Sequence, residues 1–193
     1  MDECPYCQST LLVPLKRKGV CSHCKNTIFI RNGKMVTEYE SKKIDWLKRV
    51  SCFDVNASLF DSTRNELENK FQSKPLFNDV CWNILNKLLE KYAGNIQFSK
   101  LIYLEMAHIL ELEGKDNKET IIRAYKNELI EMKRLKFKNV FALTTNDDHV
   151  CEECNKMSIE KIPIDIAIET NPIPNRCKNK YCRCSYGTEI ESA

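Results

Sequence analysis

Cysteine is the residue type in this sequence best suited to chemistry, with 11 copies in 193 residues, nine of them in two groups. Its thiolate acts either as a nucleophile and redox group or as a metal ligand. The first group contains two Cys-x-x-Cys pairs, Cys4/Cys7 and Cys21/Cys24. Two residues between the cysteines of a pair let both thiolates reach one ion, and two pairs complete a tetrahedral shell of four sulfurs. The spacing predicts a closed zinc site with no free position for water.

The first pair has a second interpretation, because Cys-Pro-Tyr-Cys at residues 4–7 is also the active-site tetrapeptide of glutaredoxins. A redox pair of that kind follows a buried strand and opens a helix, whereas this one is followed by Leu11-Leu12-Val13-Pro14 and a basic turn. A second pair at metal-binding spacing favours zinc over redox catalysis. His23, inside the second pair, is expected to face solvent rather than to replace a cysteine ligand.

The second group has five cysteines for the four positions of a tetrahedral site. Cys151 and Cys154 form a third Cys-x-x-Cys pair, and Cys177, Cys182 and Cys184 follow. We expect Cys151, Cys154 and Cys177 to be ligands, with either Cys182 or Cys184 as the fourth. The segment 158–168 between them is predicted to be a short strand or turn and then a short helix, clamped by the ion.

Neither group is accompanied by the residues of a hydrolytic active site. His149 stands just before the Cys151/Cys154 pair, but no second histidine follows that pair to build a His-Asn-His nuclease. We therefore assign no catalytic residue and favour a non-enzymatic protein, with a metal-dependent nuclease using His149 as the weakest alternative. Cys52 and Cys81 have no Cys or His partner at metal spacing and are expected to be small core residues.

The elements that must position these groups are predicted to be mainly helical. Apolar residues recur at three- and four-residue steps over 77–92, 98–110 and 121–135. This spacing is typical of helices with one buried face, and Gly94 and Gly114 end the first two. Weaker stripes over residues 44–71 indicate one or two further, more charged helices.

Short β-prone runs lie beside both cysteine groups. Residues 27–31 and 34–37 flank Asn32-Gly33, the dipeptide best suited to a two-residue hairpin turn, and residues 140–144 lead toward Cys151. The predicted fold class is therefore α+β, with a middle of three or more packed helices flanked by two small zinc-stabilised modules. The expected domains are a zinc ribbon at 1–40, a helical connector at 41–74, a helical domain at 75–137 and a Cys-rich zinc module at 138–193.

Both ends of the chain resemble known families. Residues 2–38 resemble a zinc ribbon, a family with two such cysteine pairs and a hairpin after the second. The segment ending in Cys-Arg-Cys at 182–184 resembles the C-terminal part of phage minor head proteins, although Asn175 and Cys177 stand where that motif often has a histidine. With its Glu-Gly-Lys turn at 113–115, most of the chain resembles a bacterial and prophage zinc-ribbon family, and this resemblance implies no activity.

The distribution of apolar residues indicates where in the cell the protein is expected to be. No stretch approaches the roughly 18 consecutive apolar residues of a membrane span, and the first residues lack a basic region followed by an apolar core. We therefore expect a cytoplasmic protein without a membrane partner. The cytosol keeps thiols reduced, which favours metal binding over disulfides.

The net charge limits which kinds of partner the chain is expected to bind. The net charge is only +3, so the chain lacks the broad basic excess of a strong nucleic-acid binder. Lys16, Arg17 and Lys18 form the best local cluster for phosphate contacts. We expect a non-enzymatic adaptor that holds two Zn²⁺ ions and docks a protein partner, with sequence-tolerant nucleic-acid binding as the first alternative.

Overall fold

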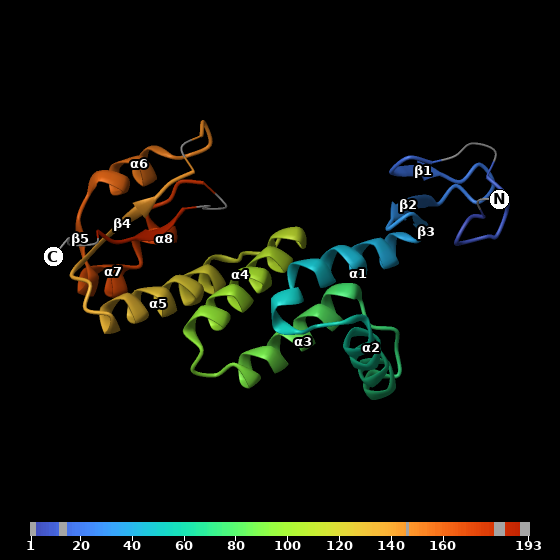
Figure 1. Cartoon of the computed structure of the whole chain (residues 1–193), viewed down its shortest axis with the longest axis horizontal. Helices are drawn as coiled ribbons and strands as arrows, with labels where there is room; N and C mark the ends of the chain where they lie inside the picture. Colours follow the sequence, from blue (N-terminus) through green and yellow to red (C-terminus); the bar gives the residue numbers. More distant parts are fainter. Residues whose placement is uncertain (1–2, 12–14, 146, 180–183, 190–193) are drawn as a thin grey trace. The chain divides into compact units, whose positions relative to one another are not determined.

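The computed structural model describes residues 3–11, 15–145, 147–179 and 184–189. The chain divides into two compact units, residues 1–84 and 85–193, and the division falls within one helix. Each unit combines helices with a small three-stranded antiparallel sheet (Figure 1). The fold class is thus α+β with a helical middle and a cysteine cluster toward each end, as the sequence predicted.

The first sheet consists of β1 (Lys18–Val20), β2 (Thr27–Arg31) and β3 (Lys34–Val36), with β2 in the centre. Asn32 and Gly33 join β2 to β3 with φ values of 51° and 74°, the left-handed pair that a tight hairpin turn requires. The predicted hairpin is therefore confirmed. Cys4, Cys21 and Ile28 of β2 form a small core, so two of the cysteines are part of it.

Helix α1 (Glu38–Arg49) follows the hairpin and packs on β2 and β3. Thr37 begins it, because the threonine hydroxyl accepts the backbone N–H of Glu40 at 3.2 Å. Arg31 of β2 donates to both carboxylate oxygens of Asp45 on α1, with Nη2 2.7 Å from Oδ2. Packing and this ion pair together fix α1 against the hairpin.

A short 3₁₀ turn, η1 (Ser51–Phe53), leads to α2 (Ala57–Phe71) and then to α3 (Phe77–Lys91). The predicted helix within 44–71 is present, but its buried face differs from the apolar stripe. Leu59 and Phe71 are exposed, whereas Phe60 and Thr63 are fully buried. Phe60 packs edge-on against Trp46 of α1, with ring centroids 5.7 Å apart, and this contact decides which face of α2 is inside.

The expectation that Cys52 and Cys81 are both core residues is half right. Cys81 on α3 is completely buried. Cys52 is exposed, because it lies in η1 while the neighbouring Phe53 takes the inward position.

In the second unit, α4 (Ile96–Leu112) and α5 (Lys118–Arg134) form a helical hairpin and lie side by side (Figure 1). Asn95 caps α4 by accepting the backbone N–H of Phe98 at 3.0 Å. Gly114, at φ 69°, ends it, and the next N–H, of Lys115, returns to Leu110 O at 2.9 Å. These caps agree with the helix ends that the sequence predicted.

Beyond α5, β4 (Asn139–Leu143) is the central strand of the second sheet, between β5 (Ile162–Pro163) and β6 (Ser185–Gly187). Three short helices complete this region: α6 (Glu152–Ile159), α7 (Ile164–Thr170) and α8 (Pro172–Asn175). The strand near 140–144 and the short helix after Pro163 are confirmed. Ser158 and Ile159, expected in a strand or turn, belong instead to the end of α6.

One hydrophobic core joins α5 to the C-terminal region. Tyr125 and Leu129 of α5 lie in the same buried cluster as Val140 of β4, Met157 of α6 and Tyr186 of β6. The third predicted helix therefore supplies one wall of the C-terminal core. Within the described residues, none of the helices has the length and apolar content needed to cross a bilayer.

Candidate metal centres

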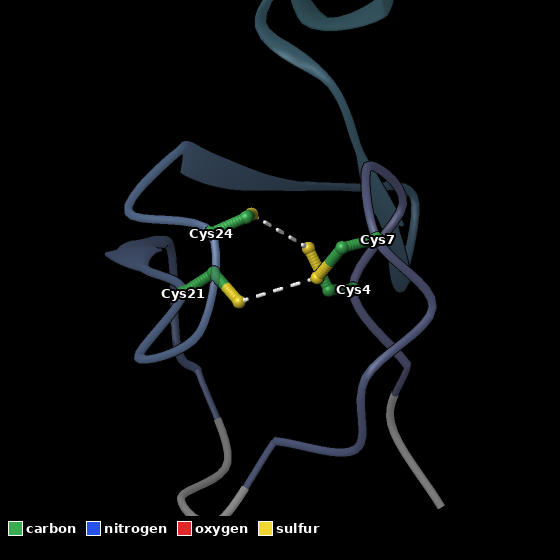
Figure 2. A group of neighbouring side chains, drawn as sticks. All are labelled: Cys4, Cys7, Cys21 and Cys24. Atoms are coloured by element: carbon green, nitrogen blue, oxygen red, sulfur yellow. Dashed lines mark hydrogen bonds between the residues drawn. The ribbon is translucent and has the colours of Figure 1, made fainter.

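The first cysteine group brings all four predicted ligands together. The sulfurs of Cys4, Cys7, Cys21 and Cys24 all lie within 4.8 Å of one another (Figure 2). Cys4 Sγ is 3.7 Å from Cys24 Sγ, and Cys7 Sγ is 3.8 Å from Cys21 Sγ. Zinc–sulfur bonds of about 2.3 Å in a tetrahedron place neighbouring sulfurs about 3.8 Å apart, whereas a disulfide needs about 2.05 Å. The group therefore has the spacing of thiolates around a single ion.

Each cysteine pair is shaped by the same backbone turn. In the first pair, Gln8 N–H donates to Cys4 O at 2.8 Å, and Cys4 N–H donates to Ser9 O at 3.0 Å. The second pair repeats both bonds, from Lys25 N–H to Cys21 O at 3.0 Å and from Cys21 N–H to Asn26 O at 2.9 Å. Gln8 and Lys25 both have φ 61°, a left-handed conformation that turns the chain back. The two turns aim two pairs of sulfurs at one point.

The four thiols do not share one electrostatic environment. Burial raises the pKa of Cys4, which is 1% exposed, to about 11. Hydrogen bonds from the hydroxyl and the backbone N–H of Ser9 lower the pKa of Cys7 to about 6. The backbone N–H of Cys24 is the main cause of a lowered pKa at Cys21. Metal binding requires the thiolate form, so binding would be linked to proton release, more strongly at Cys4 than at Cys7.

The second group brings three predicted ligands together. The sulfurs of Cys151, Cys154 and Cys177 lie within 4.8 Å of one another, and Cys151 Sγ is 3.7 Å from Cys177 Sγ. Cys151 is the N-cap of α6, and its sulfur accepts the backbone N–H of Cys154 at 3.4 Å. Cys154 lies in the first turn of α6, and its side chain is completely buried in the hydrophobic core.

Of the two predicted candidates for a fourth ligand, Cys184 lies just before β6 in the described part of the chain. Cys184 is 4% exposed and lies in the same core cluster as Cys154. Among the residues that the structure describes, Cys184 is not one of the three whose sulfurs meet within 4.8 Å. The other predicted candidate, Cys182, lies outside the described residues. Each of the two cysteine-rich groups has the composition to hold a metal ion.

Ion pairs connect the two halves of the second group. Arg176, next to Cys177, places Nη1 3.0 Å from Glu160 Oε2 and Nη2 3.8 Å from Glu153 Oε2. These contacts hold α6 beside the Cys177 segment. Burial alone would raise the pKa of Cys151, but backbone N–H groups, that of Lys178 first among them, lower it to about 7.

Among the described residues, the remaining candidates are not members of either sulfur group. The side chain of His149 is exposed. Its backbone N–H donates to Asp147 Oδ1 at 3.0 Å, and its backbone carbonyl accepts a hydrogen bond from Asn179 Nδ2 at 2.6 Å. Among the described residues His149 does not gather with the thiols, and His23 is exposed, as expected. The cluster proposed for phosphate contacts is exposed at the start of β1 and consists of Lys16, Arg17 and Lys18.

Sequence reasoning missed two tyrosines beside the second group. Tyr125 falls within the apolar helical stripe predicted over 121–135, and no sequence pattern marks Tyr186. Both are buried, and both use their hydroxyls to bind the backbone of cysteine-bearing segments. No local pattern could have found them, because Cys184 lies 59 residues from Tyr125 and Ile173 lies 13 residues from Tyr186.

No known protein family, curated protein or solved structure matches this chain.

Proposed function

We propose that the protein is a non-enzymatic adaptor in which two zinc ions stabilise two small modules that dock a protein partner. The observation that carries this proposal is the first cysteine group, with four sulfurs at the spacing of a zinc–thiolate tetrahedron. A shell of four sulfurs leaves no position for an activated water, which is the arrangement of structural rather than catalytic zinc. In the second group, Cys184 or Cys182 would complete the shell formed by Cys151, Cys154 and Cys177.

Exposed apolar residues beside both groups support a protein partner. Val20, next to Cys21, is 61% exposed and lies on β1, an edge strand of its sheet. Edge strands offer unpaired backbone groups to a partner chain. Ile159, at the end of the helix that Cys151 begins, is 88% exposed. The docking surfaces would thus be held in shape by the ions.

The proposed setting is the cytoplasm, where thiols stay reduced and available to zinc. A phage or prophage origin is part of the proposal and rests on the sequence resemblance of the C-terminal motif. The genes that neighbour this one would test it, because a minor head protein is encoded among other structural genes of a phage.

Sequence-tolerant nucleic-acid binding is the second candidate, favoured by the exposure of Lys16, Arg17 and Lys18 at the start of β1. A three-residue cluster can neutralise only a few phosphates, so such binding would be modest and would weaken steeply with salt. Such binding would also be insensitive to the base sequence of the nucleic acid, since phosphate contacts carry no sequence information.

The test compares two variants with the unchanged protein on labelled single-stranded and duplex DNA and on RNA. The first variant changes Lys16, Arg17 and Lys18 to alanine, and the second is His149→Ala. The adaptor proposal predicts no cleavage by any of the three proteins and no binding that withstands physiological salt. Tight binding abolished by the triple change would replace it with nucleic-acid binding. Metal-dependent cleavage abolished by His149→Ala would replace it with a nuclease.

A further inference from the structure

A buried hydrogen bond ties α5 to Cys184, the candidate fourth ligand of the second group that the structure describes. Tyr125 Oη–H donates to Cys184 O at 2.6 Å, between residues 59 positions apart in sequence. Tyr125 is 5% exposed and Cys184 is 4% exposed. Because a buried carbonyl without a donor is costly, this bond fixes where the backbone of residue 184 lies.

A second tyrosine extends the contact to the segment that leads to Cys177. The ring of Tyr186 packs edge-on against Tyr125, with centroids 5.7 Å apart and planes at 90°. Its hydroxyl accepts the backbone N–H of Ile173 at 2.9 Å. Cys177 follows one turn later, where its N–H donates to Pro174 O at 3.0 Å. The two tyrosines thus hold both late cysteine segments against α5.

We propose that Tyr125 is a positioning residue for the second metal ion: its hydroxyl presets the ligand segment at Cys184 and thereby raises the affinity of the C-terminal group. This inference rests on the proposed zinc binding of that group. It takes Cys184, whose backbone carbonyl Tyr125 anchors, as the fourth ligand. Groups that orient ligands without touching the ion typically change metal affinity 10–100-fold when removed.

The test uses Tyr125→Phe in the full chain, which keeps the buried ring and removes only the hydroxyl. Tyr103→Phe is the matched control, because Tyr103 lies on the neighbouring α4 and its hydroxyl makes no hydrogen bond among the described residues. Tyr186→Phe is a second variant, expected to act in the same direction through Ile173. Zinc release to a chromophoric chelator is measured for each protein, and Cys7→Ser, which removes the first site, identifies the release belonging to the second group.

The expected result is a loss of roughly 10-fold in zinc affinity at the second group for Tyr125→Phe, with the first group unchanged. Tyr103→Phe should match the unchanged protein at both groups. Two bound zinc ions with equal affinities in Tyr125→Phe and Tyr103→Phe would overturn the positioning role while leaving the proposed function intact. Absence of a second zinc ion from the unchanged protein would instead overturn the proposed function and remove the basis of this inference.

Discussion

The proposed zinc binding depends on individual sulfur atoms, and their spacing leaves little room for a different ligand atom. The sulfur–sulfur distances of 3.7 and 3.8 Å in the first group equal, within 0.1 Å, the edge of about 3.8 Å expected for zinc–thiolate coordination. A serine at any of these positions replaces a soft thiolate with a hard, neutral hydroxyl. We therefore expect each single replacement to remove the ion rather than merely to weaken it.

Cys7→Ser should lower the zinc content from two ions per chain to one. Cys52→Ser is the matched control, because Cys52 is an exposed cysteine in the same unit outside both groups. Native mass spectrometry of the two variants measures the outcome directly. Two zinc ions in Cys7→Ser would mean that this thiol is not a ligand.

Gly33→Ala tests the hairpin that follows the second cysteine pair. Gly33 has φ 74°, and a Cβ there would meet no atom within 4 Å, so the cost is backbone strain alone. We expect a loss of roughly 1–2 kcal/mol in the stability of the first module, seen as a lower melting temperature. Lys34→Ala, at the adjacent exposed position, is the control and should melt like the unchanged protein.

At the scale of elements, the first sheet and α1 act together through the Arg31–Asp45 pair. The Arg31 guanidinium holds the pKa of Asp45 below its usual range, mainly through their hydrogen bonds. A carboxylate whose pKa is lower in the folded state stabilises the fold above its unfolded pKa of about 3.9, and this contribution disappears as pH falls through the folded value. The pair should therefore contribute fully at neutral pH.

Asp45→Asn should lower the free energy of unfolding of the first unit by up to about 1 kcal/mol, since the pair is partly exposed. The loss should be equal at pH 8 and pH 6, because Asp45 is ionised at both. Glu68→Gln, an exposed change on α2, is the control. Urea unfolding followed by tryptophan fluorescence measures the free energy of unfolding of both variants. A loss that shrank between pH 8 and pH 6 would contradict the assignment.

Removing metal should affect the elements in a defined order. Structural zinc contributes roughly 10–16 kcal/mol in small zinc-binding peptides, and the first module has little core besides its cysteines, Ile28 and a few half-buried neighbours. We expect a chelator to unfold residues 1–40 while α4 and α5 keep their amide protection. Hydrogen exchange read by mass spectrometry checks this. Simultaneous loss of protection in both regions would show that the first module does not fold independently.

At the scale of the whole molecule, the features that sequence could predict are those decided by neighbouring residues. The hairpin follows from Asn32-Gly33, and the cysteine pairs from their spacing. Helices α3, α4 and α5 follow from apolar periodicity, and Gly94 and Gly114 mark the ends of the first two. Each of these signals is contained within a few residues, so no tertiary contact is needed to interpret it.

The features that sequence could not predict depend on contacts between distant segments. Helix α6 is only eight residues long and has no apolar stripe, so its start at Cys151 was not foreseen. The buried face of α2 is selected by the contact of Phe60 with Trp46 rather than by the positions of its leucines. The bond from Tyr125 to Cys184 spans 59 residues and exists only once α5 has packed on the C-terminal core.

The account as a whole depends on two metal ions, one in each cysteine group. The most direct test is the metal content of the full chain purified without added metal, measured by native mass spectrometry together with elemental analysis. We predict two zinc ions per chain, both lost on acidification because protons then compete for the thiolates. One ion, none, or an iron–sulfur cluster in either group would contradict the account.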